Sequence, residues 1–149
     1  MKTIEIMFEH LNWSNRQILK VLQTYEGVNQ QTIRLFSHIL LAEHVWFTRL
    51  KGLDSSSLPI WDDVSLEDCS RLCNENQKHY NEFLTQISDD NLEHIIHYRN
   101  SSGKEFQNTL REILTHVALH GQYHRGQINL QLRGAGFDPK PLDFIFFRR

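Results

Sequence analysis

The sequence is poor in cysteine and proline and has no long hydrophobic run. Its 149 residues include only 2 cysteines, 3 prolines and 7 glycines. No stretch approaches the ~20 consecutive apolar residues that a membrane-spanning helix needs. Residues 1–12 alternate apolar and polar side chains, so they lack the apolar core of a signal peptide. We therefore expect a cytoplasmic protein with no membrane partner.

The cysteines are too few and wrongly spaced for thiolate chemistry. Cys69 and Cys73 form a C-x-x-x-C pair, which differs from the redox motif C-x-x-C, and no further cysteine is present to complete a thiolate metal site. On a helix, positions i and i+4 share a face. The pair is therefore predicted to fill the core as small apolar residues.

Charge of one sign is also missing. The formal net charge is -2, and no run of Lys or Arg forms a stripe that could follow a phosphate backbone, which argues against nucleic acid as a main partner. Hydrophobic residues make up 40% and charged residues 23%, the balance of a globular domain. Residues 1–149 are expected to fold as a single domain.

Four segments have the apolar period of a helix, and almost all glycines and prolines lie between or after them. They cover residues 2–25, 31–51, 65–87 and 109–134. The second is apolar nearly all round and should be the most buried. Thr109 with Glu112 forms a capping box, and Ser65 with Asp68 resembles one. These features predict an all-α fold, a four-helix bundle.

Two short segments fall outside this pattern. Residues 88–108 contain Ile95, Ile96 and Tyr98, then a Ser-Ser-Gly sequence ending at Gly103, then Phe106, which fits a short hairpin with Gly at the turn. The tail, residues 137–149, contains four consecutive apolar residues, 144–147. These are too apolar to remain in water, so the tail is expected to pack on the bundle or join a second subunit.

The chain has 9 histidines, and three of them are spaced at i, i+4 and i+8: His116, His120 and His124. Each step of four advances about 40° round a helix, so neighbours in the series share a face. Such a pair can place two imidazole nitrogens on one metal ion. Gly121 occupies the position where the H-E-x-x-H motif requires Glu, which excludes a protease of that type.

The apolar stripe of the fourth segment passes through Ile113, Val117 and Ile128, and His120 and His124 are predicted to lie on it. Buried imidazoles need partners for their nitrogens. A metal ion would satisfy them, and so would hydrogen bonds to Asn15, Glu43 or water. Asn15 itself interrupts the apolar stripe of the first segment, so it should point inward and need a partner.

A third ligand has to come from another helix. His38 and His44 are six residues apart and so about 120° apart in direction, which prevents both from facing one site. Spacing alone does not choose between them, and His10 is a further candidate. The remaining histidines, at positions 79, 94 and 97, are predicted to lie on the surface or in loops.

The string from His116 to Gln127, HVALHGQYHRGQ, resembles the signature of the DinB/YfiT-like family of bacterial helical bundles with a three-histidine metal site. The similarity extends over nearly the whole chain. Its supporting positions are Trp13, Asn15, His38, Glu43, Trp46, Tyr98, Asn100, Gly103, Phe106, Leu132, Gly136, Pro141 and residues 143–147.

The resemblance implies that His38, His120 and His124 are the metal ligands and that His44 occupies a variable position. One divalent transition-metal ion, such as zinc, nickel or iron, is expected, because imidazole suits several of these metals. The candidates for residues that contact the ligand imidazoles and fix their orientation without binding the metal are Asn15, Glu43, His116 and Gln127. Three neutral imidazoles leave coordination positions free, as in catalytic sites.

The resemblance also implies a reaction class, since relatives include transferases and isomerases that use low-molecular-weight thiols. A metal-dependent transferase acting on a small-molecule thiol in detoxification or stress response is therefore the leading hypothesis, with a homodimer expected. The alternative is a non-enzymatic metal-binding or stress-response bundle. In a third interpretation the histidines are only hydrogen-bonded. No catalytic residue or substrate follows from the sequence, and the three tryptophans are predicted to be core or rim aromatics.

Overall fold

The computed structural model describes residues 1–149 and is mostly helical. The four predicted helices are present, with ends within two residues of those expected: α1 (Lys2–Thr24), α2 (Gln30–Leu50), α3 (Leu66–Thr85) and α4 (Leu110–Gly134). The shorter elements are η1 (Asp89–Asn91), β1 (Ile95–Arg99), β2 (Glu105–Thr109) and α5 (Phe144–Phe147). The predicted hairpin is therefore confirmed as a two-stranded sheet.

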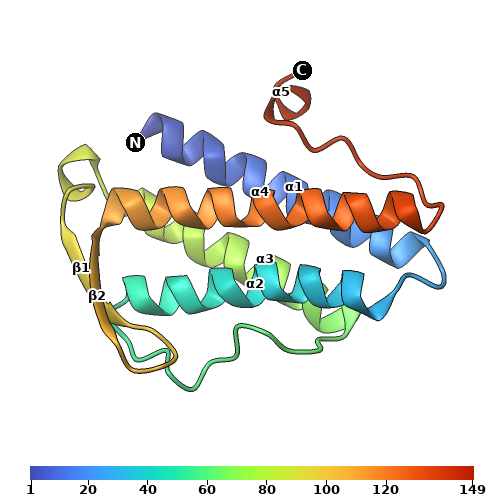
Figure 1. Ribbon diagram of the computed structural model, residues 1–149. Coiled ribbons are helices and arrows are strands. Elements are labelled where there is room, and N and C mark those ends of the chain that lie inside the picture. Colours follow the sequence, from blue (N-terminus) through green and yellow to red (C-terminus); the bar gives the residue numbers. More distant parts are fainter.

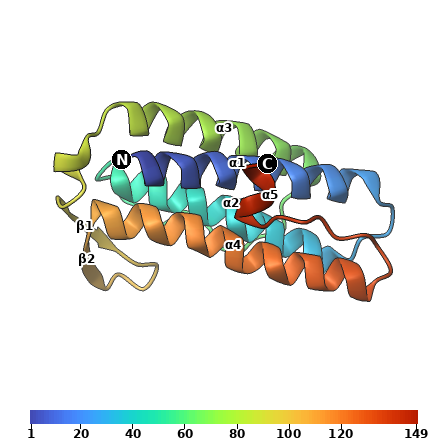
Figure 2. The ribbon, with the colours of Figure 1, turned by 90° about the horizontal axis from the view of Figure 1, so that it is seen from above.

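The four long helices lie side by side along one direction (Figures 1 and 2). Helix α2 packs against both α3 and α4, and α1 packs against the same two helices from the other side. The sheet lies at one end of the molecule, beside the start of α4 (Figure 1). No helix combines the length and the apolar character that crossing a membrane requires.

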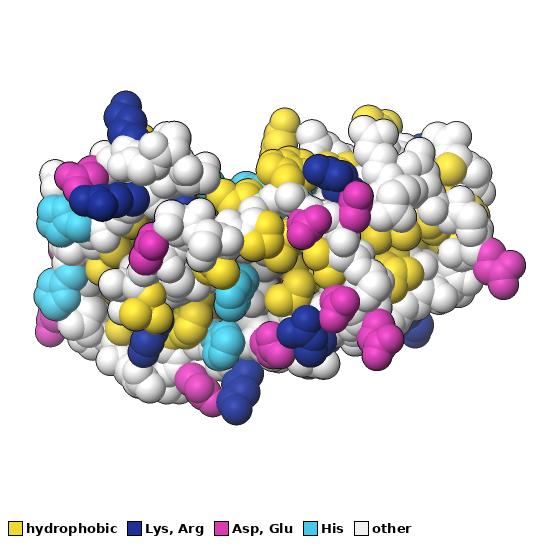
Figure 3. All heavy atoms as spheres, turned by 90° about the horizontal axis from the view of Figure 1, so that it is seen from below, with side chains coloured by type: hydrophobic (Ala, Val, Ile, Leu, Met, Phe, Trp, Pro, Cys, Tyr) yellow, Lys and Arg dark blue, Asp and Glu magenta, His cyan; other side chains and the backbone are white.

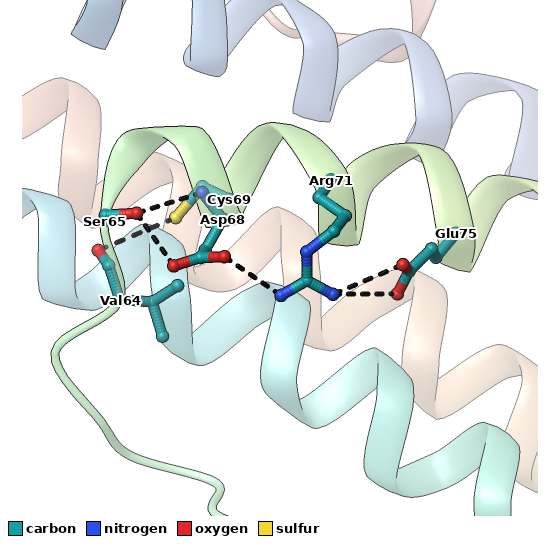
Figure 4. A network of polar contacts seen from close by, with 6 residues as sticks. All are labelled: Val64, Ser65, Asp68, Cys69, Arg71 and Glu75. Atoms are coloured by element: carbon teal, nitrogen blue, oxygen red, sulfur yellow. Dashed lines mark hydrogen bonds and ion pairs between the residues drawn. The ribbon is translucent and has the colours of Figure 1, made fainter.

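Side-chain caps fix where α3 and α4 begin. Thr109 accepts a hydrogen bond from the Glu112 amide while the Glu112 side chain accepts one from the Thr109 amide, which completes the predicted capping box. Ser65 caps α3 in a similar way through the amide of Asp68 (Figure 4). Arg71 then pairs with Asp68 and Glu75 on the exposed face, where such pairs add little stability.

The segment between α2 and α3, residues 51–65, runs back beneath α2 to the start of α3 (Figure 1). This loop therefore covers one side of α2. The hairpin β1–β2 is antiparallel, with Tyr98 opposite Phe106, and Gly103 in its turn has φ +79°, a conformation that glycine adopts without strain. The loop and the hairpin both lie next to the C-terminal end of α2.

Apolar side chains form two separate clusters along the four long helices. One contains Ile18, Leu22, Phe36, Leu40, Ile128 and Leu132 with its neighbours. The other contains Phe8, Leu11, Tyr80, Leu92, Ile113, Leu114 and Val117 with its neighbours. Cys69 and Cys73 are buried in the first cluster, as predicted, and burial raises the pKa of both thiols.

The C-terminal tail packs back on its own chain. The Nε2 of His10 on α1 donates a hydrogen bond to the carbonyl of Leu142, 2.8 Å away. The rings of Phe144 and Phe147 contact His10, and Phe147 also contacts Trp13. About half of each of Phe144, Ile145 and Phe146 remains exposed (45%, 53% and 46%), so this packing covers the apolar tail only in part.

Charged side chains of both signs are mixed on the surface. On the face shown in Figure 3, Lys and Arg stand among Asp and Glu, and no continuous stripe of one sign is visible. Several of these side chains are paired, for example Arg34 with Asp63 and Arg111 with Glu93. The mixed charge agrees with the small net charge of the sequence.

Candidate metal centre

Three histidines from two helices meet at the contact between α2 and α4. His38 comes from α2, and His120 and His124 come from successive turns of α4. One ring nitrogen from each of the three lies within 4.8 Å of the other two, a spacing that can hold one metal ion. The structure therefore brings together the three residues that the family resemblance singled out.

Hydrogen bonds fix the orientation of two of the rings. The Nδ1–H of His38 donates to the carbonyl oxygen of Ile60, 2.8 Å away in the loop beneath α2. The Nδ1 of His124 bonds to Oε1 of Gln127, one turn further along α4, at 2.6 Å. In a neutral ring that donates through Nδ1, Nε2 is the nitrogen available to a metal ion, and this is how outer groups select the coordinating nitrogen.

The third ring completes the group at short range. The Nε2 atoms of His38 and His120 are 3.1 Å apart. Metal–nitrogen bonds of about 2.1 Å in tetrahedral geometry place neighbouring nitrogens about 3.4 Å apart, so the observed separation fits two ligands of one ion. The same separation also fits a hydrogen bond from a protonated His120 Nε2 to His38.

Burial favours the neutral form of His38 and His120. It lowers the pKa of His38, and it lowers the pKa of His120 to about 3, with the neighbouring His38 and His124 acting in the same direction. Neutral rings are the form that binds metal ions. Near neutral pH the site presents uncharged nitrogen donors without any cost of deprotonation at these two residues.

The loop beneath α2 supplies an aromatic cover. The Trp61 indole stacks on the His38 imidazole with 3.6 Å between ring centroids and 3° between planes, and its edge approaches His124. Trp61 remains 48% exposed, so of the two predicted places, core or rim, it occupies the rim of the site.

The other candidate histidines lie elsewhere. His44 is on another side of α2, where burial lowers its pKa and the neighbouring His79 acts in the same direction. His79 is only half-exposed and stacks on Phe47, so its predicted surface position is only partly correct. His10 bonds to the tail, and His116 contacts both His120 and Trp46.

The predicted position of His120 and His124 on the apolar stripe of α4 needs correction. Both are half-buried and lie beside the stripe, facing α2. The buried face of α4 runs through Val117, Gly121, Arg125 and Ile128. The histidines therefore occupy a boundary between the core and the surface, which is where a ligand can reach them.

Asn15 and Glu43 were candidates for holding the ligand rings, yet their side chains bond elsewhere. Asn15 donates to Glu43 Oε1 at 2.9 Å, and Arg125 Nη1 donates to Asn15 Oδ1 at 2.7 Å. Asn76 donates to Glu43 Oε2 at 3.2 Å. The four side chains form a buried polar layer, one residue from each long helix, and none of them hydrogen-bonds to His38, His120 or His124.

This polar layer separates the two apolar clusters. On each helix its member falls between the residues of one cluster and those of the other, as Asn15 does between Leu11 and Ile18. The inward position predicted for Asn15 is confirmed, and Glu43 and Arg125 are its partners. Hydrogen bonds that join side chains from all four long helices favour one alignment of the helices.

Arg125 is the residue that sequence reasoning missed. It was given no place in the predicted core, but its side chain has no exposed surface. The signal was present, because Arg125 continues the spacing Leu114, Val117, Gly121 and Ile128 on one face of the helix. A Cβ at Gly121 would lie 2.8 Å from Arg125 Nη1, so this glycine provides the space that the guanidinium fills.

Burial also decides the charges within the layer. It raises the pKa of Glu43 to about 7, although the bonds from Asn15 and Asn76 and the positive charge of Arg125 oppose the change. Burial lowers the pKa of Arg125 to about 10, so this side chain stays protonated at neutral pH. Glu43 therefore changes its protonation near neutral pH while Arg125 does not.

Fold and site together define a helical protein with a three-histidine group able to hold a metal ion. The sequence model of the DinB family matches residues 1–149, and the chain therefore belongs to the DinB family. It is 27% identical over 155 aligned positions to Protein DinB of Bacillus subtilis (strain 168), a match that covers 93% of this chain and 89% of that protein.

A solved structure has a similar fold. The crystal structure of a DinB-like protein from Bacillus cereus ATCC 10987 superposes with a TM-score of 0.69 at 19% identity. The match covers 95% of this chain and 96% of that chain. At this identity the likeness concerns the fold, and it agrees with the family assignment.

The two glycines within α4 provide a matched test of the polar layer. We expect Gly121→Ala to lower the free energy of unfolding by roughly 1–3 kcal/mol, because the new Cβ displaces a buried guanidinium from Asn15. Gly126 has no atom near its missing Cβ, so Gly126→Ala should stabilise by up to about 1 kcal/mol. Urea denaturation of both variants measures the difference, and equal stabilities would contradict this account.

Glu43 gives a pH prediction. Its raised pKa means that the folded protein retains a proton which the unfolded chain releases, so this contribution is present at low pH and is lost as pH rises through about 7. The Glu43→Gln variant keeps the shape of the protonated Glu43 side chain but does not titrate, so it serves as the reference. From pH 5 to 8 the wild type should lose roughly 2–3 kcal/mol of unfolding free energy relative to this variant. A relative stability that stays constant over that range would show that Glu43 does not titrate there.

Proposed function

We propose that this chain is a four-helix-bundle metalloprotein in which His38, His120 and His124 bind one divalent transition-metal ion, and that it is a transferase acting on a small-molecule thiol. The observation that carries the metal proposal is the convergence of three imidazole nitrogens within 4.8 Å at the contact between α2 and α4. The all-imidazole donor set suits zinc, nickel or iron.

The surroundings of the three rings support a site that binds ligands as well as metal. Ile60 and Gln127 hold two rings with Nε2 directed inward, and half-exposed Trp61 covers one side of His38. Three protein ligands leave at least one position free, and a metal ion bound there would lower the pKa of a coordinated water or thiol. The resemblance to thiol-dependent relatives supports the choice of a thiol.

Elemental analysis of untagged protein, purified without chelator, tests the metal proposal. We expect about one equivalent of a transition metal in the wild type, loss of that metal in the His38→Ala, His120→Ala, His124→Ala triple variant, and retention in His44→Ala. His44 is the matched control, because it is a half-buried histidine of the same helix. Absence of metal from the wild type even after addition of zinc or nickel would support the hydrogen-bonded interpretation.

The reaction is tested separately on the metal-loaded protein. Conjugation of low-molecular-weight thiols to a panel of electrophiles should be accelerated by the wild type and not by the triple variant. Metal binding without any acceleration would favour the alternative, a non-enzymatic metal-binding protein. The two measurements therefore distinguish the three hypotheses derived from the sequence.

Gln127 provides a finer test of how the site is held. Its Oε1 is 2.6 Å from His124 Nδ1, so Gln127→Ala should weaken metal affinity by about 10–100-fold while leaving the stoichiometry at one. Gln131→Ala is the control, since Gln131 lies one turn further along α4 and bonds to Thr32. Competition with a chromogenic chelator measures both affinities. Equal affinities in the two variants would rule out the orienting contact.

A further inference from the structure

A second candidate site lies between the C-terminal end of α2 and the hairpin. It is a cleft of about 340 Å³ whose lining includes Arg49, Asp54, His97, Arg99 and Glu105. Its volume is at the lower end of the range for small-molecule sites. None of the three clustered histidines lines it, so the cleft is distinct from the candidate metal centre.

Arg49 differs from the other charged residues of this cleft. Arg99 pairs with Glu105, and Asp54 accepts hydrogen bonds from the amide and hydroxyl of Ser56. Arg49 is only 6% exposed and forms no ion pair with any carboxylate. A buried guanidinium without a counter-ion is costly, so its presence calls for an explanation.

The contacts of Arg49 hold the guanidinium with one edge free. Its Nε donates to Ser55 Oγ at 3.0 Å, and its central carbon lies 4.6 Å from the Trp46 ring and 5.2 Å from the Tyr98 ring. The two terminal nitrogens have no hydrogen-bond partner in the chain, and they are not enclosed by protein. A planar guanidinium with its two Nη groups free matches a carboxylate, which accepts two parallel hydrogen bonds.

We propose that Arg49 binds the carboxylate of a small-molecule ligand in the cleft between α2 and the hairpin. Cation–π contacts with Trp46 and Tyr98 hold the guanidinium in place before the ligand arrives, which reduces the ordering cost of binding. The proposal does not depend on a metal ion. The same wall does continue toward the three-histidine group, because Trp46 contacts His116 and His116 contacts His120.

Titration with succinate at constant ionic strength tests the proposal. The probe is succinate, and the readout is the NMR signal of the Arg49 Nε–H group in the wild type, which requires no variant. We expect saturable shifts of this signal, and binding at least about tenfold weaker in Arg49→Gln. Arg99→Gln is the matched control, because Arg99 lines the same cleft with its charge already paired, and its affinity should stay within about twofold of the wild type.

Further variants and a second anion distinguish the ways in which the proposal could be wrong. Arg49→Lys keeps the charge without the two-pronged geometry and should bind succinate with intermediate affinity. Unchanged binding in Arg49→Gln, or an Arg49 signal that does not respond, overturns the proposal. Inorganic phosphate that binds through Arg49 more tightly than succinate overturns the assignment to a carboxylate. The triple histidine variant should bind succinate as the wild type does, so failure of the metal proposal leaves this result interpretable.

Discussion

The rest of the structure depends on one buried guanidinium, that of Arg125. A charged side chain with no exposed surface is tolerated only where its partners are fixed, and Asn15 supplies the contact that links it to Glu43. Asn76 joins from α3, so that each long helix contributes one polar group at the same level of the molecule. Sliding or rotating any one helix would leave at least one of these groups unpaired at a cost of about 1–3 kcal/mol. Contacts between apolar side chains above and below the layer tolerate small shifts of a helix far better than these hydrogen bonds do. We therefore attribute the alignment of the helices to the polar layer.

That alignment also sets the position of the histidines. Arg125 and Gly121 define the side of α4 that faces the interior, because the guanidinium occupies the space where a side chain at position 121 would lie. With that side fixed, His120 and His124 fall at the edge of the buried face and meet His38 across the contact with α2. The residues of the polar layer therefore influence the site through the rotation of α4, and the contacts that orient the rings come from Ile60 and Gln127. The polar layer fixes the helices, and the groups around the site select the ring nitrogens.

Much of this could be predicted from the sequence, because the information is local. Apolar periodicity located the four helices, and the Thr109–Glu112 pair located the start of α4. Spacing placed His120 and His124 on adjacent turns, but it could not choose between His38 and His44, since α2 is apolar on nearly all sides; that choice came from the family resemblance. The Ile60 carbonyl and the Trp61 ring could not be foreseen, because they depend on the path of a loop with no periodic pattern. Arg125 was missed because an arginine is normally exposed, although its place in the apolar spacing and the glycine four residues earlier were both visible.

The three histidines of α4 show how one helical series can serve two environments. His120 and His124 join His38, whereas His116, one turn closer to the hairpin, has its ring against Trp46. A drift of about 40° per step turns the first member of the series away from the other two. Burial lowers the pKa of His116 and the Arg49 charge acts in the same direction, so both favour the neutral ring. The wall from His120 through His116 and Trp46 to Arg49 therefore carries one positive charge, at its far end. An anionic group that reaches this wall would therefore be attracted to the Arg49 end and not to the uncharged rings.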